Sequence, residues 1–283
     1  MPIAPAEIPR WPARPAWQVL AERRQFLILM ALLVALAWFT LWIWAQSPYG
    51  RYLDHGSWTE IGLAASICRA LPAGDIVFPA LLYVGGWVLM TAAMMLPTTL
   101  PLLETFRRLT QARPDRGRLL ALVVTGYLTV WLAFGVIAHT LDWAIHAIVE
   151  QNIWLALNGW LIGALVLAVA GLFQFSTLKY RCLEQCRMPM SFVLRHWRGD
   201  NARRQALHLG MSHGAYCVGC CWALMLLMFV VGMGSVGWML LLAAVMAIEK
   251  NLPFGRRLST PLGVALLAGA AVLFFQNGGI PLS

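Results

Sequence analysis

Long apolar segments alternate with short, polar and mostly basic segments along this chain of 283 residues. A helix that crosses the hydrocarbon core of a bilayer needs about 20 apolar residues. The pattern therefore predicts an all-α fold, a polytopic transmembrane helix bundle of about seven spans. We place these spans at residues 26–45, 76–100, 119–141, 159–178, 214–234, 236–252 and 260–276.

The sixth and seventh predicted spans are the weakest of the set. Glu249 and Lys250 shorten the sixth span, and residues rich in glycine and alanine dilute the seventh. The composition still supports a membrane protein, because 60% of the residues are hydrophobic and only 12% are charged. A water-soluble globular chain of this length carries about 25% charged residues.

Basic residues predict the orientation of the bundle, since Lys and Arg in short loops stay on the cytoplasmic side. If the chain starts in the cytoplasm, the N-terminal arm and residues 104–118, 179–212 and 250–258 are cytoplasmic, with 4, 5, 7 and 3 Lys or Arg residues. Arg51 and Arg69 fall on the other side. We therefore predict a multi-pass protein of the bacterial inner membrane, with its N-terminus in the cytoplasm and its C-terminus in the periplasm.

This topology also explains the formal net charge of +9. Basic cytoplasmic loops attract anionic membrane lipid, so lipid is the predicted partner of these charges and no nucleic-acid partner is inferred.

Three regions follow from the same pattern. Residues 1–25 are predicted to be a disordered, basic cytoplasmic arm, because the first 15 residues contain five prolines. The apolar run after the arm is longer than that of a cleaved signal peptide, so we expect it to be retained. Residues 26–276 form a single transmembrane domain, and residues 277–283 form a tail.

The largest predicted cytoplasmic segment, residues 179–212, has the pattern of a basic amphipathic helix on the membrane surface. Pro189 is expected to separate this helix from a first turn, because proline ends or kinks a preceding helix. Cys182 and Cys186 lie in that turn.

Cysteine and histidine side chains converge where the predicted fifth span begins. On a helix that turns 100° per residue, His213, Cys217, Cys220 and Cys221 fall within an arc of roughly 80–100°. Cys220 and Cys221 themselves diverge by about 100°, so one tetrahedral ion would take only one of them. Together with Cys182 and Cys186, these residues are the candidate metal ligands.

Thiolate and imidazole ligands suit a soft transition metal, which we predict to be Cu(I) or Zn(II), with copper favoured. An iron–sulfur cluster stays open as an alternative. At the predicted cytoplasmic face thiols stay reduced, so disulfides are not expected. The other interpretation is that these cysteines are small buried residues that pack helices, which is also the role expected of Cys68 in the outer loop 46–75.

Three further residues are possible additional ligands. Met94 and Met95 end the second predicted span, and thioethers bind Cu(I) better than zinc, although methionine also fills gaps between helices. Glu249 could orient His213, bind metal or carry protons. Its alternative role is an ion pair with Arg256 or with a lysine.

Several separated motifs resemble an uncharacterised bacterial family, a domain of unknown function described as predicted metal-binding integral membrane proteins. The similarity covers about residues 85–255 and implies a membrane protein that binds metal, without an established reaction. The motifs, in order, are Met94-Met-Leu-Pro97, Lys179-x-x-Cys182-Leu-x-x-Cys186-Arg-x-Pro189, Gly210-x-x-His213-Gly-x-x-Cys217-x-Gly-Cys-Cys221-Trp222 and Glu249-Lys250.

The sequence carries no catalytic signature that identifies a reaction. It has no phosphate-binding loop, dinucleotide-binding glycine run or zinc-protease motif. We therefore favour a non-enzymatic role, in which the metal site serves metal trafficking or the assembly of a metalloenzyme. Subunits of a membrane complex or a metalloprotein client are the possible partners. The alternatives are an accessory subunit with a structural metal and a membrane redox enzyme that uses the thiols or the metal.

Overall fold

The computed structural model describes residues 16–47, 77–231 and 235–277 of the chain. Within these ranges every regular element is helical, which confirms the all-α prediction. The predictions for residues 1–15, for the outer loop from residue 48 onward with Cys68, and for residues 278–283 lie outside the described residues.

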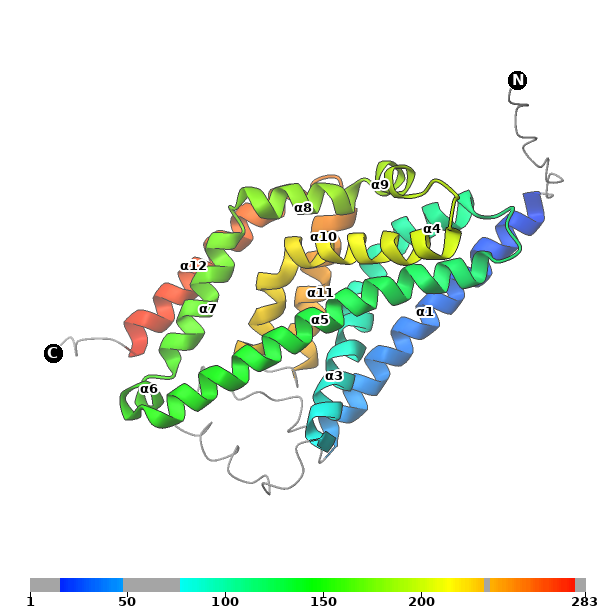
Figure 1. Ribbon diagram of the computed structural model, residues 1–283. Coiled ribbons are helices and arrows are strands. Elements are labelled where there is room, and N and C mark those ends of the chain that lie inside the picture. The colour runs from blue at the N-terminus through cyan, green and yellow to red at the C-terminus, as the bar shows by residue number, and fades with distance from the viewer. Residues whose placement is uncertain (1–15, 48–76, 232–234, 278–283) are drawn as a thin grey trace, which may run out of the picture.

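The helices fall into two outer pairs and a central group. α1 and α3 lie together at one end, α7 and α12 lie together at the other, and α5, α10 and α11 occupy the middle (Figure 1). In chain order the elements are α1 (Ala16–Gln46), α3 (Val77–Met95), the 3-10 turn η3 (Pro97–Thr99), α4 (Leu100–Leu109), α5 (Arg116–Gln151), α6 (Ile153–Leu157), α7 (Trp160–Phe173), α8 (Thr177–Arg187), α9 (Pro189–His196), α10 (Ala202–Val231), α11 (Val236–Asn251) and α12 (Gly255–Asn277).

Fewer helices qualify as membrane spans than the seven that we predicted. In the described part of the chain, four helices are long and apolar enough: Leu20–Gln46, Arg116–Val149, Ala202–Val230 and Gly255–Asn277. Two bent pairs raise the number to six if each pair is one span, one bent by 44° at Pro97 and one by 64° between α7 and α8. α11, the predicted sixth span, has only 16 residues.

The cytoplasmic segments also differ from the prediction. α1 begins at Ala16, so residues 16–25 of the arm that we expected to be disordered are helical. α8 ends before Pro189 and α9 begins at it, as predicted, but no single helix covers the rest of residues 179–212. A turn separates α9 from α10, and in it Gly199 and Asn201 have positive φ angles. Glycine and asparagine tolerate this conformation better than most residues.

α5 and α10 pack so closely that their backbones touch. A Cβ atom added to Gly210 of α10 would lie 2.0 Å from the carbonyl oxygen of Val123, and one added to Gly126 of α5 would lie 2.3 Å from the carbonyl oxygen of Leu207. Small residues permit such close helix packing. This contact places the side of α5 that carries Tyr127 against α10.

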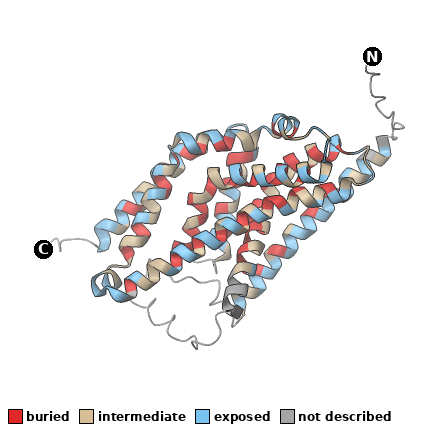
Figure 2. Ribbon diagram, viewed as in Figure 1, coloured by how far each residue is buried: buried red, intermediate tan, exposed pale blue. Residues whose placement is uncertain are grey.

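The outer helices expose apolar side chains. Only 22% of the apolar window in α1 and 17% of that in α12 is buried, whereas 67% of the α10 window is buried. Figure 2 shows the same contrast between the outer helices and the interior. Water-soluble monomers rarely expose apolar surface over such extents. The exposed faces of α1 and α12 are therefore compatible with a membrane protein.

Ion pairs join the basic segments at one end of the molecule. Glu22 of α1 pairs with Arg116 of α5 at 2.7 Å. Glu104 of α4 accepts bonds from Arg107 and Arg108 of its own helix and lies 3.5 Å from Arg23 of α1. α4 also contacts α9. Three of the four segments that we predicted to be cytoplasmic thus converge.

Candidate metal centre

Three helices, α3, α8 and α10, bring sulfur atoms together in the interior. The five cysteines of α8 and α10 are free thiols, and those of α10 are at most 2% exposed. Met95, at the end of α3, is fully buried in the same core. The candidate ligands of this sulfur cluster are Met95, Cys182, Cys186, Cys217, Cys220 and Cys221.

Cys217 lies at the centre of the sulfur cluster. Its Sγ atom is 3.0 Å from the hydroxyl oxygen of Tyr127 and 2.9 Å from the Nζ atom of Lys250, which donates a hydrogen bond to it. The Cys186 thiol of α8 faces Cys217 and Cys220. The two cysteine groups that are thirty residues apart in the sequence therefore meet at Cys217.

A second group of contacts surrounds the Lys250 ammonium. Its Nζ atom lies 3.7 Å from Met95 Sδ and 3.7 Å from Cys221 Sγ, and it donates to Thr98 Oγ1 at 3.3 Å. The Cys221 and Met95 sulfur atoms are 3.9 Å apart. The sulfur atoms of Met95, Cys217 and Cys221 thus surround one buried positive charge.

The two neighbouring cysteines of α10 serve different sides of the cluster. Cys220 faces Cys186, whereas Cys221 faces Met95. Both thiols also lie close to the Cys217 carbonyl oxygen, at 3.1 and 2.9 Å. This divergence is the one expected from adjacent positions on a helix.

Cys182 packs against the backbone of α10. A Cβ atom on Gly219 would lie 2.7 Å from the Cys182 sulfur, so glycine at this position allows α8 to approach. Cys182 is thereby held beside the cysteine-bearing turn of α10.

The break at Pro97 leads into the cluster from the side of α3. The hydroxyl groups of Thr98 and Thr99 donate to the carbonyl oxygens of Met95 and Leu96 at 2.7 and 2.8 Å. The carbonyl groups freed by the break are therefore satisfied within the chain. The atoms that remain available in the cluster are therefore sulfur atoms, with a hydroxyl group beside them.

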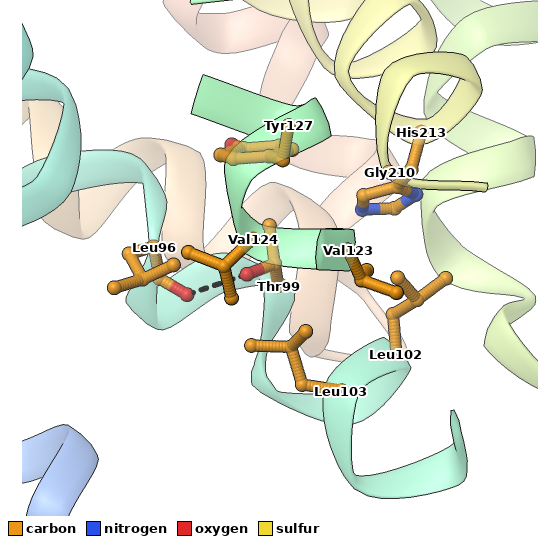
Figure 3. Close-up of a pocket in the computed structure, with 9 residues that line it drawn as sticks. All are labelled: Leu96, Thr99, Leu102, Leu103, Val123, Val124, Tyr127, Gly210 and His213. Carbon is orange, nitrogen blue, oxygen red and sulfur yellow. Dashed lines mark hydrogen bonds between the residues drawn. The ribbon is translucent and has the colours of Figure 1, made fainter. Parts of the chain in front are cut away.

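His213 takes a different environment from the cysteines. Its ring packs 5.9 Å from the Tyr127 ring and 5.4 Å from the Phe192 ring, measured between centroids. Figure 3 shows it among the residues that line a pocket, and this pocket has no room for a water molecule. Its buried Nδ1 atom has no hydrogen-bond partner among the residues that the structure describes. The other pocket residues are Leu96, Thr99, Leu102, Leu103, Val123, Val124, Tyr127 and Gly210.

Met94 and Glu249, the remaining sequence candidates, have structural partners. Met94 is buried in the hydrophobic core around the cluster. Glu249 Oε1 accepts hydrogen bonds from Lys179 Nζ at 2.6 Å and from Ser259 Oγ at 2.7 Å. Its partner is therefore a buried lysine of α8.

The sequence analysis expected Glu249 to pair with Arg256 or with a lysine, and the structure contains the pair with a lysine, Lys179. Arg256 stacks over the Tyr180 ring, with its guanidinium carbon 5.1 Å from the ring centroid. The contacts of Glu249 do not support a role in orienting His213, because its hydrogen bonds are with Lys179 and Ser259.

The sequence analysis missed Tyr127, Lys179 and Lys250. It counted both lysines among the charges of cytoplasmic segments, yet Lys179 is fully buried and Lys250 is 5% exposed. One signal was available: Glu249 and Lys250 are adjacent at the end of an apolar helix, so they point about 100° apart and each needs its own partner.

The donor set of the cluster suits a soft cation. Within the described ranges, no three His, Cys, Asp or Glu side chains form a preformed ligand group for one ion. Methionine is not among these residue types, and the Lys250 ammonium takes the position between the sulfur atoms. Thiolate and thioether sulfur are the ligands that select Cu(I). Oxygen atoms also lie beside the sulfur atoms, namely the Tyr127 and Thr98 hydroxyl groups, but among the described residues no carboxylate forms a hydrogen bond with Cys217 or Lys250.

Comparison with known proteins identifies the family. A family model described as PpoB2, copper chaperone, matches residues 84–273, about two thirds of the chain. The match includes the whole sulfur cluster and Lys250. No curated protein and no solved structure matches the chain. This result agrees with the metal-related resemblance seen in the sequence and favours copper among the metals considered there. The chain belongs to the PpoB2 family of copper chaperones.

Proposed function

We propose that this protein is a membrane-embedded copper chaperone that carries Cu(I) in the sulfur cluster and delivers it to a metalloprotein client. The observation that carries the proposal is the placement of Met95, Cys217 and Cys221 around one buried cation. A position that stabilises a desolvated ammonium with sulfur is suited to a monovalent metal ion of soft character.

The proposed ligands form two sets that share Cys217. Cys217, Cys221 and Met95 make up the set around Lys250, whereas Cys186 and Cys220 face Cys217 from the side of α8. Copper can move between the two sets by exchanging one sulfur ligand at a time, because the shared Cys217 stays bound. Stepwise exchange is the chemistry that a chaperone needs for transfer without release of free copper.

His213, Cys182 and Glu249 have supporting roles in this proposal. His213 packs against the Tyr127 ring in the same pocket, and the Tyr127 hydroxyl group contacts Cys217. Cys182 lies next to the turn that carries Cys220. Glu249 fixes the end of α11 through Lys179.

The membrane setting is supported by the exposed apolar faces of the outer helices and by the four to six candidate spans in the described residues. We place the protein in the bacterial inner membrane with its basic end in the cytoplasm, since Lys and Arg mark the cytoplasmic side and bind anionic lipid. The sulfur cluster would then lie near the cytoplasmic ends of α3 and α11.

Copper binding by the purified protein tests the proposal. The full chain is purified in detergent under reducing, anaerobic conditions and loaded with Cu(I). Copper per chain is measured by elemental analysis, and affinity by competition with a coloured Cu(I) chelator. We expect about one or two tightly bound copper ions for the wild type, since the two sets share a ligand. Cys217→Ser should lose copper binding at both ligand sets. Met239→Leu, at a buried position of α11, is the matched control and should bind copper as the wild type does.

Two outcomes would contradict the proposal. If the wild type binds no Cu(I), the protein is not a copper carrier of this kind. If folded Cys217→Ser protein keeps the wild-type affinity, the sulfur cluster is not the site. The accessory alternative, in which the metal is structural, predicts instead that metal-free wild-type protein loses its helical circular dichroism on mild warming, whereas a chaperone must stay folded when empty.

A further inference from the structure

Lys250 is a buried cation whose direct partners are sulfur and hydroxyl groups. In the part of the chain that the structure describes, its Nζ atom contacts Cys217, Cys221, Met95 and Thr98. The neighbouring carboxylate of Glu249 is engaged by Lys179 and Ser259 instead. The positive charge of Lys250 is therefore directed to the metal ligands.

We propose that Lys250 is the specificity-determining residue of the site and that its fixed positive charge selects monovalent over divalent soft ions. This inference rests on the proposed function, because it assigns a role in the copper site. Lys250 must yield the position between the sulfur atoms when a metal enters, but its tether on α11 keeps the ammonium close to the bound ion.

The selection follows from Coulomb's law. Repulsion between the ammonium and a bound ion is proportional to the charge of the ion, so a divalent ion is repelled twice as strongly as a monovalent one. Burial makes the difference larger than it would be in water.

Charge balance leads to the same result. Two cysteine thiolates balance the Lys250 ammonium and one Cu(I), which gives a neutral buried site. The same groups with Zn(II) keep one uncompensated positive charge, which is costly in the protein interior.

Lys179 provides an internal comparison. It is also a buried lysine beside α11, but it is paired with Glu249 at 2.6 Å. Its charge is already compensated, so it has little effect on an ion in the sulfur cluster. The two lysines thus have distinct roles although both belong to the same end of the molecule.

Ag(I) and Cd(II) are the probes that isolate charge, since both bind thiolates strongly and have the same d-electron count. The affinity of each ion is measured by chelator competition on the full-length, reduced protein in detergent. The proteins are the wild type, Lys250→Leu, which removes the charge and adds no metal-binding atom, and Lys250→Arg, which keeps the charge. A small dithiol provides the reference ratio of the two affinities.

We expect the wild type to prefer Ag(I) over Cd(II) more strongly than the dithiol does. Lys250→Leu should raise the Cd(II)-to-Ag(I) affinity ratio by roughly 100- to 1,000-fold, from the Coulomb repulsion of one additional ionic charge about 4–6 Å away at an effective dielectric constant near 20. Lys250→Arg should leave the ratio near the wild-type value.

An unchanged ratio in folded Lys250→Leu protein overturns the inference, and the copper result with Cys217→Ser then still stands on its own. If Lys250→Leu does not fold, the wild-type ratio decides: a preference no stronger than that of the dithiol overturns the inference. A wild type that binds neither Ag(I) nor Cu(I) overturns the inference and the proposed function together.

Discussion

The close contact of α5 and α10 can be tested by adding one methyl group at Gly210. In Gly210→Ala the new Cβ atom would lie 2.0 Å from the Val123 carbonyl oxygen and 2.8 Å from its carbonyl carbon. An ordinary contact starts near 3.4 Å. Because the colliding atoms are backbone, no side-chain rotation relieves the clash, and the two helices must separate by about 1.4 Å.

The expected cost comes from this separation. Overpacking of a well-packed interior costs about 1–3 kcal/mol, and a backbone clash belongs at the upper end of that range. The better helix propensity of alanine returns at most about 1 kcal/mol. We therefore expect a net loss of about 2 kcal/mol, which lowers the melting temperature by roughly 4–8 °C in a chain of this size.

Thermal unfolding in detergent, followed by helical circular dichroism, measures the effect. Gly269→Ala is the matched control, because Gly269 also lies within a long helix but has no atom within 4 Å of the added Cβ. The control should melt at or slightly above the wild-type temperature. Gly210→Ala should also weaken copper binding, since Tyr127 lies on α5 one turn after Val123 and contacts Cys217 at 3.0 Å.

A Gly210→Ala protein that melts like the wild type would refute this reasoning about the helix contact. An equal decrease in Gly269→Ala would show that any added methyl group destabilises these helices, and the specific role assigned to the α5–α10 contact would then fail.

Two further substitutions test the surroundings of the sulfur cluster. Glu249→Gln leaves the buried Lys179 ammonium without its carboxylate and should lower the free energy of unfolding by about 3–5 kcal/mol. Lys179→Met combined with Glu249→Gln should recover much of that loss. A double variant that melts no higher than the single one would contradict the pairing. Gly219→Ala places a Cβ atom 2.7 Å from the Cys182 sulfur and should lower the melting temperature, and adding Cys182→Ala should restore it because the sulfur is removed. A failure of Cys182→Ala to restore stability would show that the clash lies elsewhere.

The sequence predicted the helices and the meeting of the two cysteine groups for sound physical reasons. Apolar length identifies long helices, and Pro189 ends α8 where the sequence predicts. The i, i+4 spacing of Cys182 and Cys186 and the spacing on α10 predicted one-sided thiol faces, and Cys186 does face Cys217.

The number of spans could not be predicted as well, because a hydropathy window does not detect bends. The second predicted span is interrupted at Pro97, and the fourth turns by 64° between α7 and α8. The close contact of α10 did leave a signal: Gly210 and Gly214 form a small-xxx-small pattern, which is typical of tightly packed helices.

The ligand set was the least predictable part. His213 shares the helical arc of the cysteines, but it lies one to two turns before them along α10, where its ring packs against Tyr127 and Phe192. The rotation of α11 cannot be read from its own apolar pattern either. Lys250 was therefore assigned to a cytoplasmic loop, although it contacts Cys217.

The contacts of Glu249 supply the reason for the orientation of Lys250. Glu249 is held by Lys179 of α8 and Ser259 of α12, which fixes the rotation of α11 at its end. Adjacent helical positions diverge by about 100°, so the next residue is directed away from this ion pair and toward the sulfur atoms. The Arg187 guanidinium adds a bond to the Pro253 carbonyl oxygen at 3.0 Å and another to that of Glu249, which ties α8 to the same end of α11. One buried network thus positions both the charge of Lys250 and the helix that carries the Cys186 thiol.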